Sequence, residues 1–118
     1  MWHFPGGTVY MEEKLEEAVS RVANEEISAD VKVKNMIGII EYPELFNYAI
    51  GVAFLCQLKS EKQEFKGSFQ AEEIRAFKTI PDNMILEQKR FLDHYIYHTY
   101  LKDDKIEYET INGFWSEV

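Results

Sequence analysis

Glutamates crowd the segment from residue 12 to residue 26, and Glu25 and Glu26 are adjacent. Neighbouring like charges repel each other, but a nearby cation relieves that repulsion. Carboxylate oxygens are the ligands that Mg²⁺ and Mn²⁺ prefer, and Mg²⁺ is usually held by one or two carboxylates together with waters and substrate phosphates. A backbone carbonyl in the glycine turn at Gly6 and Gly7 can join such a set. The competing interpretation is a helix face in which every glutamate is simply solvated.

A helix over residues 13–27 is predicted to present these carboxylates. Its apolar residues recur at helical spacing, at Leu15, Ala18, Val19, Val22 and Ala23. The preceding "FPGG" ends any earlier element, because proline is rigid and glycine takes dihedrals that other residues avoid. The segment therefore reads as a glycine turn followed by an acidic amphipathic helix.

This segment resembles the Nudix box, G-x5-E-x7-R-E-U-x-E-E-x-G-U, in which U is a bulky aliphatic residue. Counted from Gly7, the matching positions are Glu13, Arg21, Glu25 and Glu26. The flanking "W-x-x-P-G-G" and "LEEA" are also typical of such boxes. The match is long and its spacing is fixed, so it outweighs the solvated-face interpretation. Residues 2–29 carry the diagnostic part of the resemblance.

The resemblance implies a hydrolase that acts on a nucleoside diphosphate linked to another group and uses Mg²⁺ or Mn²⁺. Carried over residue by residue, it makes Glu26 the best metal ligand and Glu25 a second ligand or a supporting carboxylate, with the Gly6 carbonyl as a third ligand. Glu13 and Arg21 are expected to form a salt bridge that closes the loop against the helix. Arg21 lies one helical turn before Glu25 and can steady that carboxylate.

Four further site residues are predicted. Glu73 lies where Nudix domains often carry another acidic residue, and we expect it to join Glu25 and Glu26 in catalysis. We expect Arg21, His3 and Tyr48 to contact substrate: His3 because it is beside the glycine turn, and Tyr48 because an aromatic ring can stack on a base or sugar. Core packing is the competing role for the tyrosine. The identity of the general base is left open.

Val22 departs from the box, which has a metal-binding glutamate at that position. A branch of the family, the GDP-mannose mannosyl hydrolases, is similar in having an apolar residue there, and it attacks carbon rather than phosphorus. This likeness favours a nucleotide sugar as substrate. The alternative is a catalytically impaired domain that binds a nucleotide or a protein. Ser28 and Ala29 also depart from the expected glycine and aliphatic residue, and we expect the serine to require a different helix exit from glycine.

The box begins close to Met1, whereas several strands precede it in the family. Three explanations remain open: a truncated reading frame, strands supplied by a partner molecule, or a C-terminal segment, residues 105–115, that fills part of the gap. We favour a homodimer that covers the gap, with Phe114 and Trp115 as anchors of a segment that crosses to the partner.

The rest of the chain predicts strands at 31–40, 47–58, 72–80 and 105–111. The strand at 47–58 is largely apolar and is expected to be central. A helix is predicted from Pro81 to about residues 102–104, with Asp82 or Asn83 as its cap. The fold class is α+β: a single Nudix-like domain over residues 1–118, with an α/β/α sandwich, a mixed sheet and a shortened N-terminus.

The amino-acid composition limits the kinds of partner that the chain is expected to bind. A formal net charge of −8 disfavours a nucleic-acid polymer but not a nucleotide whose charge a metal ion neutralises. No apolar run reaches membrane-spanning length, so no membrane partner is expected. The one cysteine, Cys56, is read as a buried, inert thiol, and the lack of an intrachain disulfide fits the cytoplasm.

Overall fold

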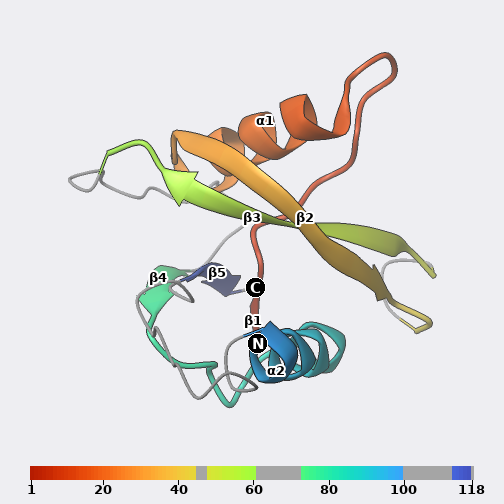
Figure 1. Ribbon diagram of the computed structural model, residues 1–118, viewed down its shortest axis with the longest axis vertical. Helices are drawn as coiled ribbons and strands as arrows, with labels where there is room; N and C mark the ends of the chain where they lie inside the picture. The colour runs from red at the N-terminus through yellow and green to blue at the C-terminus, as the bar shows by residue number, and fades with distance from the viewer. Residues whose placement is uncertain (45–47, 61–72, 100–112, 118) are drawn as a thin grey trace.

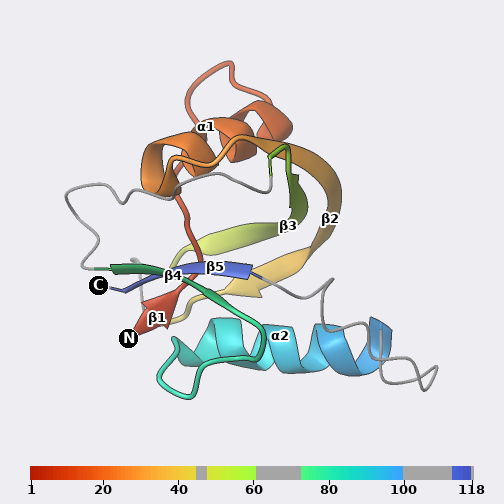
Figure 2. The ribbon, with the colours of Figure 1, turned by 90° about the vertical axis from the view of Figure 1, so that its left-hand side faces the viewer.

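The structure is a computed structural model that describes residues 1–44, 48–60, 73–99 and 113–117. Its elements are, in chain order, β1 (Trp2–His3), α1 (Leu15–Ile27), β2 (Val31–Glu41), β3 (Ile50–Leu58), β4 (Glu73–Phe77), α2 (Leu86–Thr99) and β5 (Gly113–Glu117). Helix α1 lies on one side of the strands and helix α2 on the other (Figures 1 and 2). The predicted α/β/α sandwich is therefore confirmed.

The strands form two antiparallel sheets, so the prediction of a mixed sheet is wrong for the named strands of the described residues. One has the order β1-β5-β4 and the other is the pair β2-β3. The expectation that residues 47–58 form a central strand is wrong for the described residues, because β3 pairs only with β2 there. Two irregularities in the register, between Val33 and Asn35 and between Met36 and Gly38, interrupt the β2–β3 ladder. Such bulges increase the twist of a hairpin, and Figure 2 shows β2 as a strongly curved strand.

Each helix covers a different part of this curved hairpin. Near the start of β2, Val31 packs with Ile27, the last residue of α1, and with Ala29 just after the helix. Toward the other end of β2, Ile40 and Tyr42 pack with Ile85 just before α2 and with Phe91 within it. The hairpin thus carries the apolar contacts that hold both helices.

The chain's first residues are fixed by the segment before α2. Trp2 is buried, its amide donates to the Asn83 carbonyl at 2.7 Å, and its carbonyl accepts from the Ile85 amide at 2.9 Å. This backbone pairing explains why α2 begins at Leu86 rather than at the predicted cap, Asp82 or Asn83. Backbone groups that pair with a neighbouring strand cannot also adopt the hydrogen-bonding pattern of a helix.

Strand β5 closes the small sheet within its own chain. Its backbone pairs with β1 on one side and with β4 on the other, with Phe114 opposite Ala76 and Trp115 opposite Arg75. The expectation that Phe114 and Trp115 anchor a crossing to a second copy is therefore wrong. The predicted strand at 105–111 and the predicted helix end at 102–104 lie outside the described residues.

A buried glutamine joins three elements. Gln88 of α2 is 5% exposed, accepts a hydrogen bond from the Phe4 amide at 2.7 Å and donates to the Tyr42 hydroxyl at 3.0 Å. Because the buried amide has a partner at both ends, its desolvation is compensated. The bonds tie the chain leading into the glycine turn to β2 and α2.

Candidate functional site

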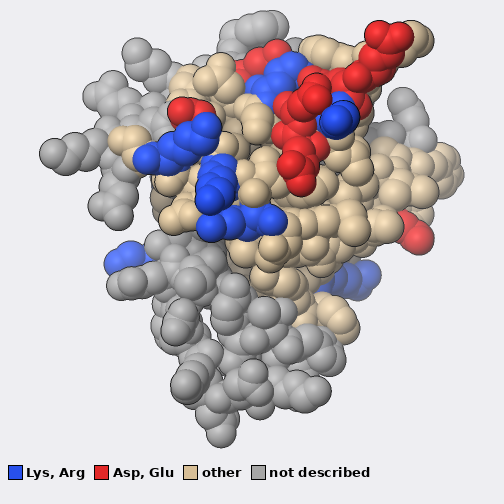
Figure 3. Space-filling model, turned by 45° about the horizontal axis from the view of Figure 1, so that its top comes forward, with Lys and Arg blue, Asp and Glu red and all other residues tan. Residues whose placement is uncertain are grey.

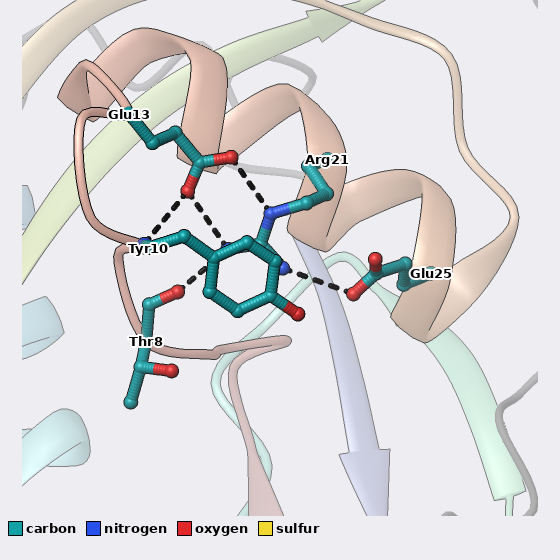
Figure 4. A network of polar contacts seen from close by, with 5 residues as sticks. All are labelled: Thr8, Tyr10, Glu13, Arg21 and Glu25. Carbon is teal, nitrogen blue, oxygen red and sulfur yellow. Dashed lines mark hydrogen bonds and ion pairs between the residues drawn. The ribbon is translucent and has the colours of Figure 1, made fainter.

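Arg21 is the centre of a polar network that joins helix α1 to the turn before it (Figure 4). Its Nε donates to Glu13 Oε2 at 2.8 Å and its Nη2 to Glu13 Oε1 at 3.0 Å. Nη2 also donates to the Thr8 carbonyl at 2.6 Å, and Nη1 donates to Glu25 Oε2 at 3.0 Å. The Tyr10 ring lies over the guanidinium, with its centroid 3.6 Å from Cζ. Both predicted pairs, with Glu13 and with Glu25, are thus present.

The charges of this network stabilise one another. Hydrogen bonds from Arg21 and from the Tyr10 amide lower the pKa of the Glu13 carboxyl below its ordinary value of 4.5. In return, the hydrogen bond to Glu13 raises the pKa of the Arg21 guanidinium. The bidentate geometry is the strong form of an arginine–carboxylate pair. Glu13 and Arg21 are therefore both charged at neutral pH, and the loop is tied to the helix.

Val22 faces the glycine turn. A Cβ atom placed on Gly7 would lie 2.9 Å from Val22 Cγ2, so the valine occupies the space that any larger residue at position 7 would need. Residues four apart share a helix face, so Glu26 follows Val22 along the same ridge. The turn therefore requires glycine at position 7 because of this close approach to Val22. A positive φ is not the reason, since no glycine in the described residues has one.

The two adjacent glutamates have different surroundings. Glu25 is held by Arg21 and its side chain is 52% exposed. Glu26 is half-buried and lies about 100° further round the helix. The pair offers hard carboxylate oxygens, which fits a Mg²⁺ ion that also uses water and phosphate ligands. Within the described residues, no group of three or more His, Cys, Asp and Glu side chains gathers around a common point.

The other predicted site residues come from outside this helix. Glu73 begins β4, where its carboxylate accepts a hydrogen bond from Arg75 Nη2 at 2.6 Å. Tyr48 precedes β3, is 78% exposed and has a φ of 62°. His3 is in β1, with its Nδ1 2.7 Å from the Phe4 carbonyl oxygen. Gly6 is exposed in the turn before α1. Their roles in catalysis, substrate binding and metal binding stay predictions.

Arg21 has little capacity left for substrate in this arrangement, because its Nε, Nη1 and Nη2 atoms all donate within the chain. The structure also adds Thr8 and Tyr10, which the sequence did not single out. The sequence holds one feature that could have pointed to Tyr10, which is its position three residues before Glu13. In the structure the Tyr10 amide donates to Glu13 Oε1 at 3.0 Å, and the Tyr10 carbonyl accepts from the Glu13 amide at 3.1 Å.

An open hollow of about 620 Å³ lies between α1 and the start of β2. Its lining comprises Glu16, Glu17, Ser20, Val31, Lys32, Val33 and Lys59, and includes none of the predicted site residues. Figure 3 shows acidic and basic side chains side by side on the α1 side of the molecule. Mixed charges of this kind do not form the single-sign surface that binds a nucleic-acid backbone.

The thiol of Cys56 in β3 is half-buried and not fully buried as predicted, and this partial burial raises its pKa. A raised pKa disfavours the reactive thiolate, which agrees with the predicted inert cysteine. No helix among the described residues is long and apolar enough to cross a membrane.

Comparison with known proteins identifies the family. The family model of the NUDIX domain matches residues 1–113, so the chain belongs to the Nudix family. The chain is also similar to the low-salt glycan biosynthesis protein Agl8 of Haloferax volcanii, with 44% identity over 41 residues. That match covers 35% of this chain and spans only 26% of the relative's length. No solved structure matches the chain.

Proposed function

We propose that the protein is a Nudix-type hydrolase that requires Mg²⁺ or Mn²⁺ and cleaves a nucleoside diphosphate linked to another group, with a nucleotide sugar as the preferred substrate. The observation that carries the proposal is the Arg21 network, which joins the box residues Glu13, Arg21 and Glu25 and fixes the glycine turn against α1. A helix that only exposed its charges to water would not need this connection, in which the Arg21 and Glu13 side chains are only 19% and 13% exposed.

The roles of the two glutamates follow from their surroundings. Glu26 is the direct metal ligand in this proposal, because it lies on the same ridge as Val22, which contacts the glycine turn that carries the Gly6 carbonyl. Glu25 shares its charge with Arg21 and serves as a second or supporting carboxylate. A bound divalent ion would polarise the diphosphate and neutralise charge that develops on it. Glu73 is the proposed additional carboxylate.

The preference for a nucleotide sugar rests on two features. The first is Val22, an apolar residue in contact with the glycine turn where the box usually has a carboxylate. The second is the partial similarity to a protein whose name places it in glycan biosynthesis. Glycans are built from activated sugars, so an enzyme that acts on a nucleotide sugar fits such a setting. His3 and Tyr48 are the proposed contacts to the substrate.

A panel of nucleoside diphosphate derivatives, with and without Mg²⁺ or Mn²⁺, tests the proposal. We expect product release that stops when a chelator is added, and the product distinguishes attack at carbon from attack at phosphorus. Glu26→Gln should abolish the metal-dependent turnover while the protein stays folded, because it removes a ligand charge from a partly exposed position. Glu17→Gln, on an exposed part of the same helix, is the matched control. Wild-type rates in Glu26→Gln would contradict the assignment.

A second function is a Nudix-like domain that binds a nucleotide or a protein without turnover. One observation favours it: Val22, which cannot bind a metal, faces the glycine turn at the position where the box usually has a glutamate. Calorimetry with the same nucleotides separates the two functions, because binding without product release supports the second.

We also propose that the chain forms a homodimer through one face of the β2–β3 hairpin. Ile39 lies opposite Val52, and Ile50 shares their face, since alternate strand residues point the same way. These side chains are 60%, 39% and 70% exposed, respectively. An identical patch on a second copy is the complementary occupant, because an isologous contact pairs the same apolar surface with itself. A cytoplasmic location is proposed from the single cysteine.

A further inference from the structure

We propose that Tyr10 is a positioning residue of the site: its ring shields the Arg21 guanidinium from water and so holds the Glu25 carboxylate in one orientation beside Glu26. This role rests on the proposed function only in so far as it predicts an effect on metal binding. The ordering of Arg21 and Glu25 by the ring does not depend on that function. The box spacing does not specify a residue at position 10, so this role belongs to the chain's own sequence.

The stacking geometry supports the role. The Arg21 Cζ lies 3.6 Å from the centroid of the Tyr10 ring, well inside the range of about 6 Å over which a cation is attracted to an aromatic face. The Arg21 side chain is only 19% exposed, although it belongs to a surface helix. Tyr10 itself remains 55% exposed, so its ring forms the outer wall of the network.

The turn holds this ring in place. The Tyr10 amide donates to Glu13 Oε1 and the Tyr10 carbonyl accepts from the Glu13 amide, so both backbone groups of the tyrosine are tied to the same glutamate. Glu12, within the turn, has a φ of 67°, a conformation that few residues other than glycine adopt. Because both backbone groups of Tyr10 are hydrogen-bonded within the turn, its ring has little freedom to move away from the Arg21 guanidinium.

The two arms of Arg21 differ in how much they need the ring. Glu13 receives two hydrogen bonds and its side chain is only 13% exposed. Glu25 receives one bond from Arg21, at 3.0 Å, and its side chain is 52% exposed. Exposed single ion pairs contribute little by themselves, because water competes for both partners. Loss of the ring should therefore loosen the Glu25 arm first.

The experiment compares Tyr10→Ala and Tyr10→Phe with the wild type. Met11→Ala is the matched control, because Met11 is the next residue along the loop and is 93% exposed. Two quantities are measured on the metal-free and the Mn²⁺-titrated protein: the exchange of the Arg21 guanidinium protons with water by NMR, and the Mn²⁺ affinity by electron paramagnetic resonance. Urea unfolding separates a local change from a loss of global stability.

Tyr10→Ala should speed exchange of the Nη1 protons that face Glu25 more than exchange of the Nε proton that faces Glu13. It should also change the Mn²⁺ affinity by about two- to fivefold, the range expected for loss of an exposed cation–π contact. Tyr10→Phe should restore both quantities, because it keeps the ring, and Met11→Ala should change neither. A purely structural role would alter the unfolding midpoint without this difference between the two arms.

Unchanged Nη1 exchange in Tyr10→Ala would overturn the inference, as would an effect of equal size in Met11→Ala. Faster exchange with unchanged Mn²⁺ affinity would overturn the link from the ring to Glu25's role in metal binding. A wild-type protein that binds no Mn²⁺ would instead refute the proposed function. In that case the proton exchange still decides whether Tyr10 orders the Arg21–Glu25 arm.

Discussion

At the scale of single residues, Arg21 connects the parts of the site. It touches a backbone carbonyl, two carboxylates and an aromatic ring, which come from the turn and from α1. The guanidinium can do this because it is planar, always charged and carries five donors. Lysine would offer one point charge and could not bridge Glu13 and Glu25 in the same way.

The contact between Val22 and the glycine turn leads to a prediction about metal binding. Val22→Glu should increase the affinity for Mn²⁺ by about tenfold or more, because it adds a carboxylate on the ridge that carries Glu26 and faces Gly7. Isothermal titration calorimetry measures the change. Ser20→Glu adds the same charge at an exposed position of α1 and should change the affinity little. An affinity unchanged by Val22→Glu would mean that this face does not hold the ion.

The lowered pKa of Glu13 leads to a prediction about pH. A carboxyl with a depressed pKa in the folded protein contributes stability above its ordinary value of 4.5, and this contribution is lost as the pH falls through the folded-state pKa. The wild type should therefore be more stable than Glu13→Gln at pH 6, and the difference should shrink as the pH falls toward 3. Urea unfolding at several pH values measures it. A difference that is constant with pH would show that the Glu13 charge is not what stabilises the turn.

At the scale of elements, the ends of α1 depart from the usual capping residues. Lys14 is at the N-cap and makes no capping hydrogen bond with its side chain, whereas serine, threonine, aspartate and asparagine are preferred there. At the other end, Ser28 has a φ of 55° and a ψ of 33°, the left-handed conformation that glycine usually provides. The expectation that serine requires a different exit is wrong, because the backbone takes the glycine conformation with serine in place. The turn closes with the Ala29 amide donating to the Ala23 carbonyl at 3.1 Å.

Ser28→Gly should therefore stabilise the protein by about 0.5–1 kcal/mol, because glycine avoids the steric cost of a left-handed residue. Ser20→Gly is the matched control: the same substitution inside the helix should destabilise by about 0.5–1 kcal/mol. The free energy of unfolding in urea gives both values. Destabilisation in both variants would indicate that the Ser28 side chain stabilises more than its backbone conformation costs.

At the scale of the whole molecule, the hairpin has one face in the core and part of the other at the surface. Ile40 and Tyr42 are buried against α2, while Ile39, which directly precedes Ile40 and lies on the opposite face, is 60% exposed. In the part of the chain that the structure describes, the β2–β3 sheet has only two strands. Exposed apolar faces and open strand edges are the features that favour association.

The proposed homodimer predicts a concentration-dependent mass. The wild type should sediment as a dimer at low micromolar concentration, and Ile39→Glu should shift it to a monomer by placing a charge in the apolar contact. Met11→Glu places the same charge at another exposed apolar residue, far along the chain from the hairpin, and should leave the dimer intact. A well-folded wild-type monomer at tens of micromolar would contradict the proposal.

The sequence alone determined α1 and the pairing of Arg21 with Glu25, because these depend on short, fixed spacings along the chain, and residues four apart meet on a helix. The pairing of Arg21 with Glu13 was expected only from the resemblance to the Nudix box. The tertiary structure decided what depends on distant contacts. Trp2 pairs with residues 83–85 and delays the start of α2, and β5 closes its own sheet instead of crossing to a partner. The tertiary structure also placed Tyr10 over Arg21, because the direction of the ring depends on the backbone dihedrals of the turn and not on its composition. Local spacing carries no information about which distant backbone groups will satisfy one another's hydrogen bonds.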